Sequence, residues 1–209
     1  MSYNNNHILN IYKSRMNILN IMEYQGYAVS DYVNFNINQV DAMLSNAQLD
    51  MLIENGNTKQ KTYIKYYFNS KQIRQNNLDE IIEDLYIIDE VLDKKDNLIV
   101  IIEDEPNDVI ISRLRYLYEN DGIFVVIHNI HRLQYNILNH ELVPKCVVLS
   151  DDETNEFKQN YNISTGSQLP EISRFDPQAL ALCMRPSQVC KFTRKSITAL
   201  ETIYYRICV

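Results

Sequence analysis

The N-terminal part of the chain opens with apolar residues at helical spacing. One series recurs at three- and four-residue steps and would give a helix a single apolar face: Leu9, Tyr12, Met16, Leu19 and Met22. Gly26 is expected to end this helix. The segment "VDAMLSNAQLDMLIEN" (40–55) has a similar pattern and predicts a second helix that stops at Asn55-Gly56.

Further along, two continuous apolar runs flank a helical segment. The runs "NLIVIIED" (97–104) and "GIFVVIHNI" (122–130) lack polar alternation, which is typical of strands buried on both faces. Residues 105–120 between them predict a helix, and residues 79–94 predict an acidic helix before them. A strand, a helix and a strand in this order predict a βαβ unit with a right-handed crossover. We therefore predict one α/β domain over residues 1–138.

The last third of the chain carries two helix-start signals. Ser150 and Glu153 fit a capping box, which predicts a helix that runs to about Asn160. Asp176-Pro177 predicts the start of a shorter helix, because an acidic residue caps the end and proline fits the first turn.

Short strands surround these helices. The segment "CVVLS" (146–150) predicts one strand. Residues 187–196 and 201–209 alternate in polarity and predict two more. Residues 139–209 are therefore predicted to form a second, small α+β domain.

The charge of the chain limits its direct partners. It carries 27 acidic and 20 basic side chains, a net charge of −7. The excess lies in residues 1–140, because residues 141–209 hold eight acidic and eight basic side chains. Affinity for nucleic acid comes largely from neutralising phosphates, so this chain is not expected to bind DNA strongly by itself. Its four glycines argue against glycine-rich phosphate loops.

The first residues and the lengths of the apolar runs predict a soluble intracellular protein. The first residues lack the charged and then apolar segments of a secretory signal. The apolar runs are far shorter than the roughly 20 residues of a membrane span, so no membrane partner is expected. Four cysteines are expected to be reduced and packed in the core: Cys146, Cys183, Cys190 and Cys208.

One stretch of the acidic N-terminal part is basic and aromatic. Its cations interleave with tyrosine and phenylalanine between residues 59 and 74: Lys59, Lys61, Lys65, Lys71 and Arg74. Two interpretations stay open. The stretch is either a strand with a solvated face or a local patch that contacts a nucleic-acid backbone.

The sequence offers little for catalysis or metal binding. His140 and Glu141 are adjacent, so their side chains point apart, and His128 and His131 could share a helical face but not a strand face. A nuclease of the restriction-endonuclease type needs an acid-x-lysine pair beside its other acids, and the acids at 103–105 have no such lysine. We expect no catalytic residue, no metal and no cofactor.

Residues 140–209 carry a series of short motifs in a fixed order. The pieces are "HELVPK" (140–145), "VVLSDDE" (147–153), "YNI…QLPEI" (161–172), "DP" (176–177), "RKSIT" (194–198) and "YYRICV" (204–209). In order and spacing this segment resembles a small archaeal RNA polymerase subunit and its eukaryotic counterpart, the fifth-named small subunit shared by the three nuclear RNA polymerases. The long form, with about 140 further N-terminal residues, is similar to the eukaryotic member of this family and its relatives in large DNA viruses.

The chain departs from the family pattern at four positions. Cys146 stands where a second histidine is usual. Cys183, Ser187 and Leu200 stand where glycine is common around the final hairpin. Leucine in a turn is expected to need different backbone angles from glycine, which puts the hairpin geometry in question.

The resemblance implies a non-catalytic structural subunit of a multisubunit DNA-directed RNA polymerase. The C-terminal domain would dock on the largest subunit. The N-terminal domain would have an inactive restriction-endonuclease-like fold and form the lower jaw near downstream DNA during transcription. Other polymerase subunits would be further partners, duplex DNA would be contacted weakly and within the complex, and no homo-oligomer is expected. The protein would reside in the nucleus if cellular, or in the virion or viral factory if it comes from a large DNA virus.

Residues on or beside the matching motifs are the candidates for the largest-subunit interface. Arginine and tyrosine among them are the residue types most enriched at interface hot spots: His140, Lys145, Arg174, Arg194, Ser196, Thr198, Tyr205 and Arg206. The five cations between residues 59 and 74 are the candidates for proximity to downstream DNA. The alternative function is a free-standing nucleic-acid- or protein-binding adaptor of the same fold.

Overall fold

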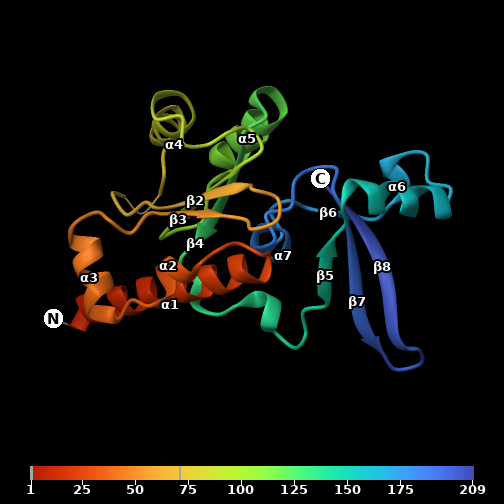
Figure 1. Ribbon diagram of the computed structural model, residues 1–209, viewed down its shortest axis with the longest axis horizontal. Helices are drawn as coiled ribbons and strands as arrows, with labels where there is room; N and C mark the ends of the chain where they lie inside the picture. Colours follow the sequence, from red (N-terminus) through yellow and green to blue (C-terminus); the bar gives the residue numbers. More distant parts are fainter. Residues whose placement is uncertain (1, 71) are drawn as a thin grey trace. The chain divides into compact units, whose positions relative to one another are not determined.

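The computed structural model describes residues 2–70 and 72–209 (Figure 1). The chain forms two compact units, Met1–Asn136 and Ile137–Val209. The boundary lies two residues before the predicted one, at 136 instead of 138. Within the described ranges, no helix is both long and apolar enough to cross a membrane.

The first unit begins with the predicted long helix, α1 (Ser2–Tyr24). Its buried face includes Ile11, Ile18 and Met22. The chain leaves the helix at Gly26, whose φ of 86° is in the left-handed region that glycine adopts without strain. The predicted helix and its end at Gly26 are confirmed, but of the five residues predicted on its apolar face only Leu19 and Met22 are buried, and Leu9 is exposed.

The predicted helix over residues 40–55 is wrong in its second half. After the short α2 (Ser30–Val33), α3 covers Ile37–Ser45, and its N-terminus is closed by a capping box between Asn36 and Gln39. The chain then turns and forms a strand, β1 (Met51–Glu54), with alternating burial. β1 pairs antiparallel with β2 (Lys61–Tyr66), and this non-local pairing decides the conformation of a short apolar run that local pattern leaves ambiguous.

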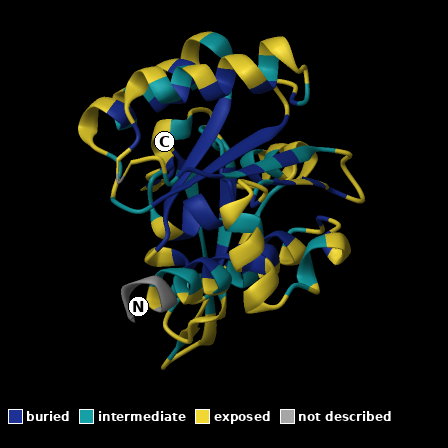
Figure 2. Ribbon diagram, turned by 90° about the vertical axis from the view of Figure 1, so that its left-hand side faces the viewer, coloured by how far each residue is buried: buried dark blue, intermediate teal, exposed yellow. Residues whose placement is uncertain are grey.

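The four strands form one mixed sheet in the order β1-β2-β3-β4. β3 (Asn97–Ile102) and β4 (Phe124–Asn129) run parallel to β2 and are buried along their whole length, as predicted. α5 (Asp108–Tyr116) connects β3 to β4, which confirms the βαβ unit. Helices cover both faces of the sheet, with α1 on one side and α4 (Gln75–Glu83) and α5 on the other (Figures 1 and 2).

Two helices of this unit end in a wider turn. α4 continues into a five-residue π-helical turn, η1 (Asp84–Ile88), and α5 continues into another, η2 (Leu117–Asp121). Gly122 follows with a φ of 71° and ends the second of these turns. The acidic helix predicted over 79–94 is therefore shorter than expected. A short 3₁₀ turn, η3 (Arg132–Gln134), follows β4.

The second unit is a small mixed α/β domain. Its sheet has the strand order β5-β7-β8-β6. The strands are β5 (Lys145–Val148), β6 (Glu171–Ile172), β7 (Val189–Ser196) and β8 (Leu200–Cys208). Two 3₁₀ turns, η4 (Ile137–Asn139) and η5 (Gly166–Gln168), lie in its connections.

Both predicted helix starts of this unit are confirmed. The Ser150 side chain accepts a hydrogen bond from the Glu153 backbone amide and Glu153 reaches back to Ser150, closing the start of α6 (Asp151–Asn160). The Asp176 side chain accepts a hydrogen bond from the Gln178 amide at the start of α7 (Pro177–Ala181).

The backbone keeps a glycine-like conformation at the three positions where glycine is common in the family and this chain has another residue. The φ angles are 50° at Cys183, 73° at Ser187 and 59° at Leu200, all in the left-handed region. The expectation that leucine changes the backbone angles of the turn is therefore wrong. At Leu200 the β7–β8 pairing, which runs from Val189↔Ile207 to Ser196↔Leu200, holds leucine in a conformation that this residue type disfavours. Cys183 and Ser187 lie between α7 and β7, outside this pairing.

Replacing Leu200 with glycine is expected to stabilise the C-terminal unit by about 1 kcal/mol, because a left-handed leucine costs about that much and this exposed side chain contributes little packing. Urea unfolding of the full chain measures the change. Ile197→Gly is the matched control: Ile197 is also exposed in the same turn but its φ is not positive, so glycine there should destabilise. Equal effects of the two substitutions would contradict the strain at Leu200.

Candidate interaction surface

One face of the C-terminal sheet leaves apolar side chains in solvent. The strand register places Lys145, Thr193 and Ile203 in one row across β5, β7 and β8. Val147, Lys191 and Tyr205 form the next row. Ile203 and Val147 are each more than half exposed. Apolar side chains among lysines on an open sheet face are typical of a surface that another protein covers.

The tip of the β7–β8 hairpin extends this surface. Ile197 and Leu200 are almost fully exposed there. The Ser196 hydroxyl accepts a hydrogen bond from the Ala199 amide at 3.3 Å and lies 3.4 Å from the Thr198 hydroxyl. Ser196 and Thr198 therefore shape the turn that presents the two aliphatic side chains.

On the other face of the hairpin, two arginines are held over a tyrosine. The Tyr204 ring stacks on Phe192 with 5.0 Å between ring centroids. The guanidinium carbons of Arg194 and Arg206 lie 5.6 Å and 5.8 Å from the Tyr204 ring centroid. Arg206 also donates a hydrogen bond to the Glu171 carbonyl oxygen at 2.9 Å. Arginines ordered in this way lose less entropy on binding than free ones.

The structure does not place all predicted interface residues on these surfaces. Arg174 is only 5% exposed, so its side chain packs within the unit instead of presenting a contact. Tyr205 packs on Phe157 of α6 with 4.1 Å between ring centroids. His140 is exposed in the segment before β5, where its Nδ1 accepts a hydrogen bond from the Leu142 amide at 3.2 Å.

Sequence reasoning missed the exposed aliphatic residues of the surface: Val147, Ile197, Leu200 and Ile203. Strand alternation groups Ile203 with Tyr205 and Ile207, but it does not say which part of that face is covered. α6 covers the end near Tyr205 and Val189, and leaves the end near Ile203 open. The signal that could have indicated this is the difference in rise per residue, because a strand of nine residues at about 3.3 Å each extends past a helix of ten residues at about 1.5 Å each.

The basic stretch of the first unit does not form a continuous cationic surface. Lys59 forms an ion pair with Glu54 at 3.4 Å, and Lys65 forms one with Asp50 at 3.3 Å. Lys61 and Arg74 form no ion pair within the described part of the chain. Lys71 lies outside the described residues. The predicted strand is confirmed as β2, and carboxylates partly neutralise its charge.

Asp50 also organises the tyrosine on the same face of β2. The Tyr63 hydroxyl donates a hydrogen bond to the Asp50 carboxylate at 3.2 Å. Burial, followed by the charge of Asp50, raises the pKa of Tyr63 to about 12. The tyrosine therefore stays neutral at physiological pH, and the stretch gains no charge from it.

The side chains considered for catalysis or metal binding are engaged in packing and ion pairs. Among the described residues, no group of three or more histidine, cysteine, aspartate or glutamate side chains could hold a metal ion. Glu103 pairs with His7 at 2.9 Å, and Glu105 pairs with Arg132 at 2.7 Å.

The four cysteines are buried free thiols, as predicted. Burial raises the pKa of Cys183 to about 12 and that of Cys208 to about 11. These two thiols are therefore protonated and weakly nucleophilic at neutral pH.

Comparison with known proteins assigns the C-terminal unit to a class of polymerase subunits. A family model described as "RNA polymerase Rpb5, C-terminal domain" matches residues 135–208. The chain is 43% identical over 76 residues to DNA-directed RNA polymerase subunit Rpo5 of Thermococcus celer, covering 36% of this chain and 92% of that protein. It is 39% identical over 77 residues to Rpo5 of Archaeoglobus fulgidus, covering 37% of this chain and all of that protein.

The chain therefore belongs to the family of the RNA polymerase subunits Rpb5 and Rpo5. The resemblance noted in residues 140–209 is confirmed. The relatives are named as subunits of DNA-directed RNA polymerase, in agreement with the expectation that this chain is not an enzyme by itself. The matched residues form the unit that carries the exposed hairpin surface.

Proposed function

We propose that this chain is a non-catalytic structural subunit of a multisubunit DNA-directed RNA polymerase, and that its C-terminal unit docks on the largest subunit. The family assignment supports the polymerase, and one observation carries the docking. One sheet face and the hairpin tip present Val147, Ile197, Leu200 and Ile203 to solvent, and the opposite face of the hairpin carries the ordered Arg194 and Arg206. A hairpin with this composition is suited to burial in a stable complex.

The N-terminal unit is the proposed lower jaw near downstream DNA. Its mixed four-stranded sheet with helices on both faces is compatible with a restriction-endonuclease-like fold without the nuclease site. The acidic charge of this unit supports only weak DNA contact within the assembled enzyme. Lys61 and Arg74 are the best placed of the four described cations for such a contact, because Lys59 and Lys65 are already paired. The protein would be found where that polymerase works, in the nucleus of a cell or in the virion or factory of a large DNA virus.

Charge substitution on the open sheet face is expected to release the chain from the polymerase. In Ile197→Asp/Ile203→Asp, two carboxylates would be desolvated in the interface, which should reduce recovery of the largest subunit at least about tenfold. The measurement is a tagged pull-down of the full chain from its native source, with the partners quantified by mass spectrometry. The two large polymerase subunits should be recovered in equal amount with the unchanged chain.

Two controls separate docking from other effects. Val109→Asp introduces one such carboxylate at an exposed apolar position of the N-terminal unit and should leave recovery unchanged. Lys61→Glu/Arg74→Glu should also leave it unchanged, because these residues are assigned to DNA proximity. Recovery of the unchanged chain alone or with unrelated proteins would favour the free-standing adaptor.

A further inference from the structure

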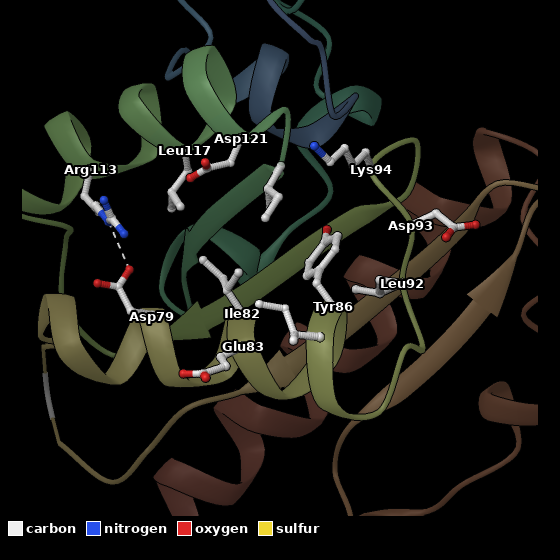
Figure 3. A pocket seen from close by; sticks show the side chains of 12 residues that line it. Asp79, Ile82, Glu83, Tyr86, Leu92, Asp93, Lys94, Arg113, Leu117 and Asp121 are labelled. Atoms are coloured by element: carbon white, nitrogen blue, oxygen red, sulfur yellow. Dashed lines mark hydrogen bonds and ion pairs between the residues drawn. The ribbon is translucent and has the colours of Figure 1, made fainter.

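The N-terminal unit has a groove between the ends of its two π-turn helices (Figure 3). Its volume is about 480 Å³, and it opens between α4/η1 on one side and α5/η2 on the other. This volume lies within the roughly 300–1,000 Å³ typical of sites that bind ligands. None of its residues belongs to the hairpin surface, so it is a separate feature from the proposed docking site.

The floor of the groove is apolar, and both π-helical turns contribute residues to it. Ile82, Leu92, Leu117 and Ile123 line it together with Tyr86. η1 contributes Tyr86 and η2 contributes Leu117, so both π-helical turns shape the site. π-helical turns are rare and are often found at functional sites.

An exposed isoleucine at the edge marks the groove as a contact surface. Ile87 lines the groove and is 67% exposed. A large aliphatic side chain in solvent beside an apolar groove adds to the area that a partner could bury, at about 25 cal/mol per Å².

The rim of the groove is acidic. Four carboxylate residues and two cationic residues line it, which gives a net charge of 2 − 4 = −2. Two of the four carboxylates are already paired, Asp79 with Arg113 at 2.9 Å and Asp93 with the neighbouring Lys95 at 3.9 Å. Glu83 and Asp121 flank the apolar floor from opposite helices (Figure 3). This charge repels phosphate-bearing ligands and attracts cationic ones.

We propose that this groove binds a peptide segment of another protein that inserts aliphatic side chains between lysines or arginines. The apolar floor would take the aliphatic side chains, and the carboxylates of the rim would face the flanking cations. This arrangement corresponds to the recognition of an amphipathic segment in a hydrophobic groove, with charge complementarity selecting basic partners.

A fluorescence anisotropy titration of the full chain tests the site. The probe is a short labelled peptide with two leucines one helical turn apart between lysines. Ile87→Ser should weaken its binding roughly five- to tenfold, as expected for losing one buried aliphatic contact. Ile88→Ser is the matched control, because Ile88 is 66% exposed beside Ile87 but lies outside the groove, and it should bind as the unchanged chain does.

A second pair of variants tests the charge complementarity. Glu83→Lys on the rim should weaken binding of the lysine peptide and reduce its salt dependence, whereas Glu80→Lys, outside the groove, should have a smaller effect. A peptide with glutamates in place of the lysines should bind the unchanged chain at least about tenfold more weakly.

Three outcomes would overturn the proposal. The first is no saturable binding of the lysine peptide to the unchanged chain, and the second is equal binding by Ile87→Ser and Ile88→Ser. The third is equal affinity for the lysine and glutamate peptides. All four substituted residues lie on the exposed side of α4 and η1, so the fold should survive each change.

Discussion

Phe192→Ala is expected to unfold the C-terminal unit or leave it marginally stable. Phe192 is 2% exposed and belongs to a core cluster with Cys146, Ile172 and Met184. Its ring also stacks on Tyr204 at an interplanar angle of 8°. Removing a buried phenylalanine costs about 3–5 kcal/mol, which is most of the stability of a small domain.

Hydrogen exchange with mass spectrometry on the full chain measures this effect locally. Peptides from β7 and β8 should lose their protection in Phe192→Ala, whereas peptides from β3, in the separate core of the first unit, should keep theirs. Ile203→Ala is the matched control, because Ile203 lies on the same hairpin and is 51% exposed. Protection of β7 and β8 like that of the unchanged chain would show that this stacked pair does not hold the unit together.

Asp96→Ala is expected to destabilise the N-terminal unit by about 3 kcal/mol or more, because it removes two charge-assisted hydrogen bonds. Asp96 is 1% exposed. Its carboxylate accepts one hydrogen bond from the Lys61 amide and one from the Asp93 amide, each at 2.8 Å. These bonds join the start of β2 to the turn before β3. Without them both amides lose their partner at a partly buried site, where an unsatisfied donor is costly.

Urea unfolding followed by hydrogen exchange over β2 and β3 measures the loss. Asp96→Asn should show a smaller loss, because the single amide oxygen can still accept one of the two hydrogen bonds. Asp93→Ala is the control: its side chain is 77% exposed, and its backbone amide can still donate to Asp96. A loss in Asp93→Ala equal to that in Asp96→Ala would rule out the buried carboxylate as the cause.

The sequence motifs of this family predicted only part of the proposed docking surface. The motifs located the hairpin, and Arg194, Ser196 and Arg206 are on it. They did not distinguish these residues from Arg174, which lies beside a motif and is buried. Burial depends on what other segments cover, so it cannot be read from a position within a motif.

The cations between residues 59 and 74 likewise depend on the tertiary structure for their surroundings. Their clustering in the sequence suggested one basic patch, but Asp50 and Glu54 of the neighbouring strand region neutralise Lys65 and Lys59. The antiparallel pairing of β1 with β2 brings these carboxylates to the lysines. The helix predicted over residues 40–55 gave no indication of this pairing, because its second half is in fact β1.

The features that the sequence alone determined depend on local interactions. The caps at Ser150 and Asp176 join residues no more than three apart, and the continuous apolar runs of β3 and β4 need only to be buried on both faces. The family motifs of residues 140–209 are likewise a property of the sequence. The tertiary structure alone decided that Met51–Glu54 is a strand, that Leu200 adopts a left-handed conformation, and that α4 and α5 leave a groove between their ends. Each of these depends on pairing or packing between separate elements, which outweighs the weak local preferences of the residues involved.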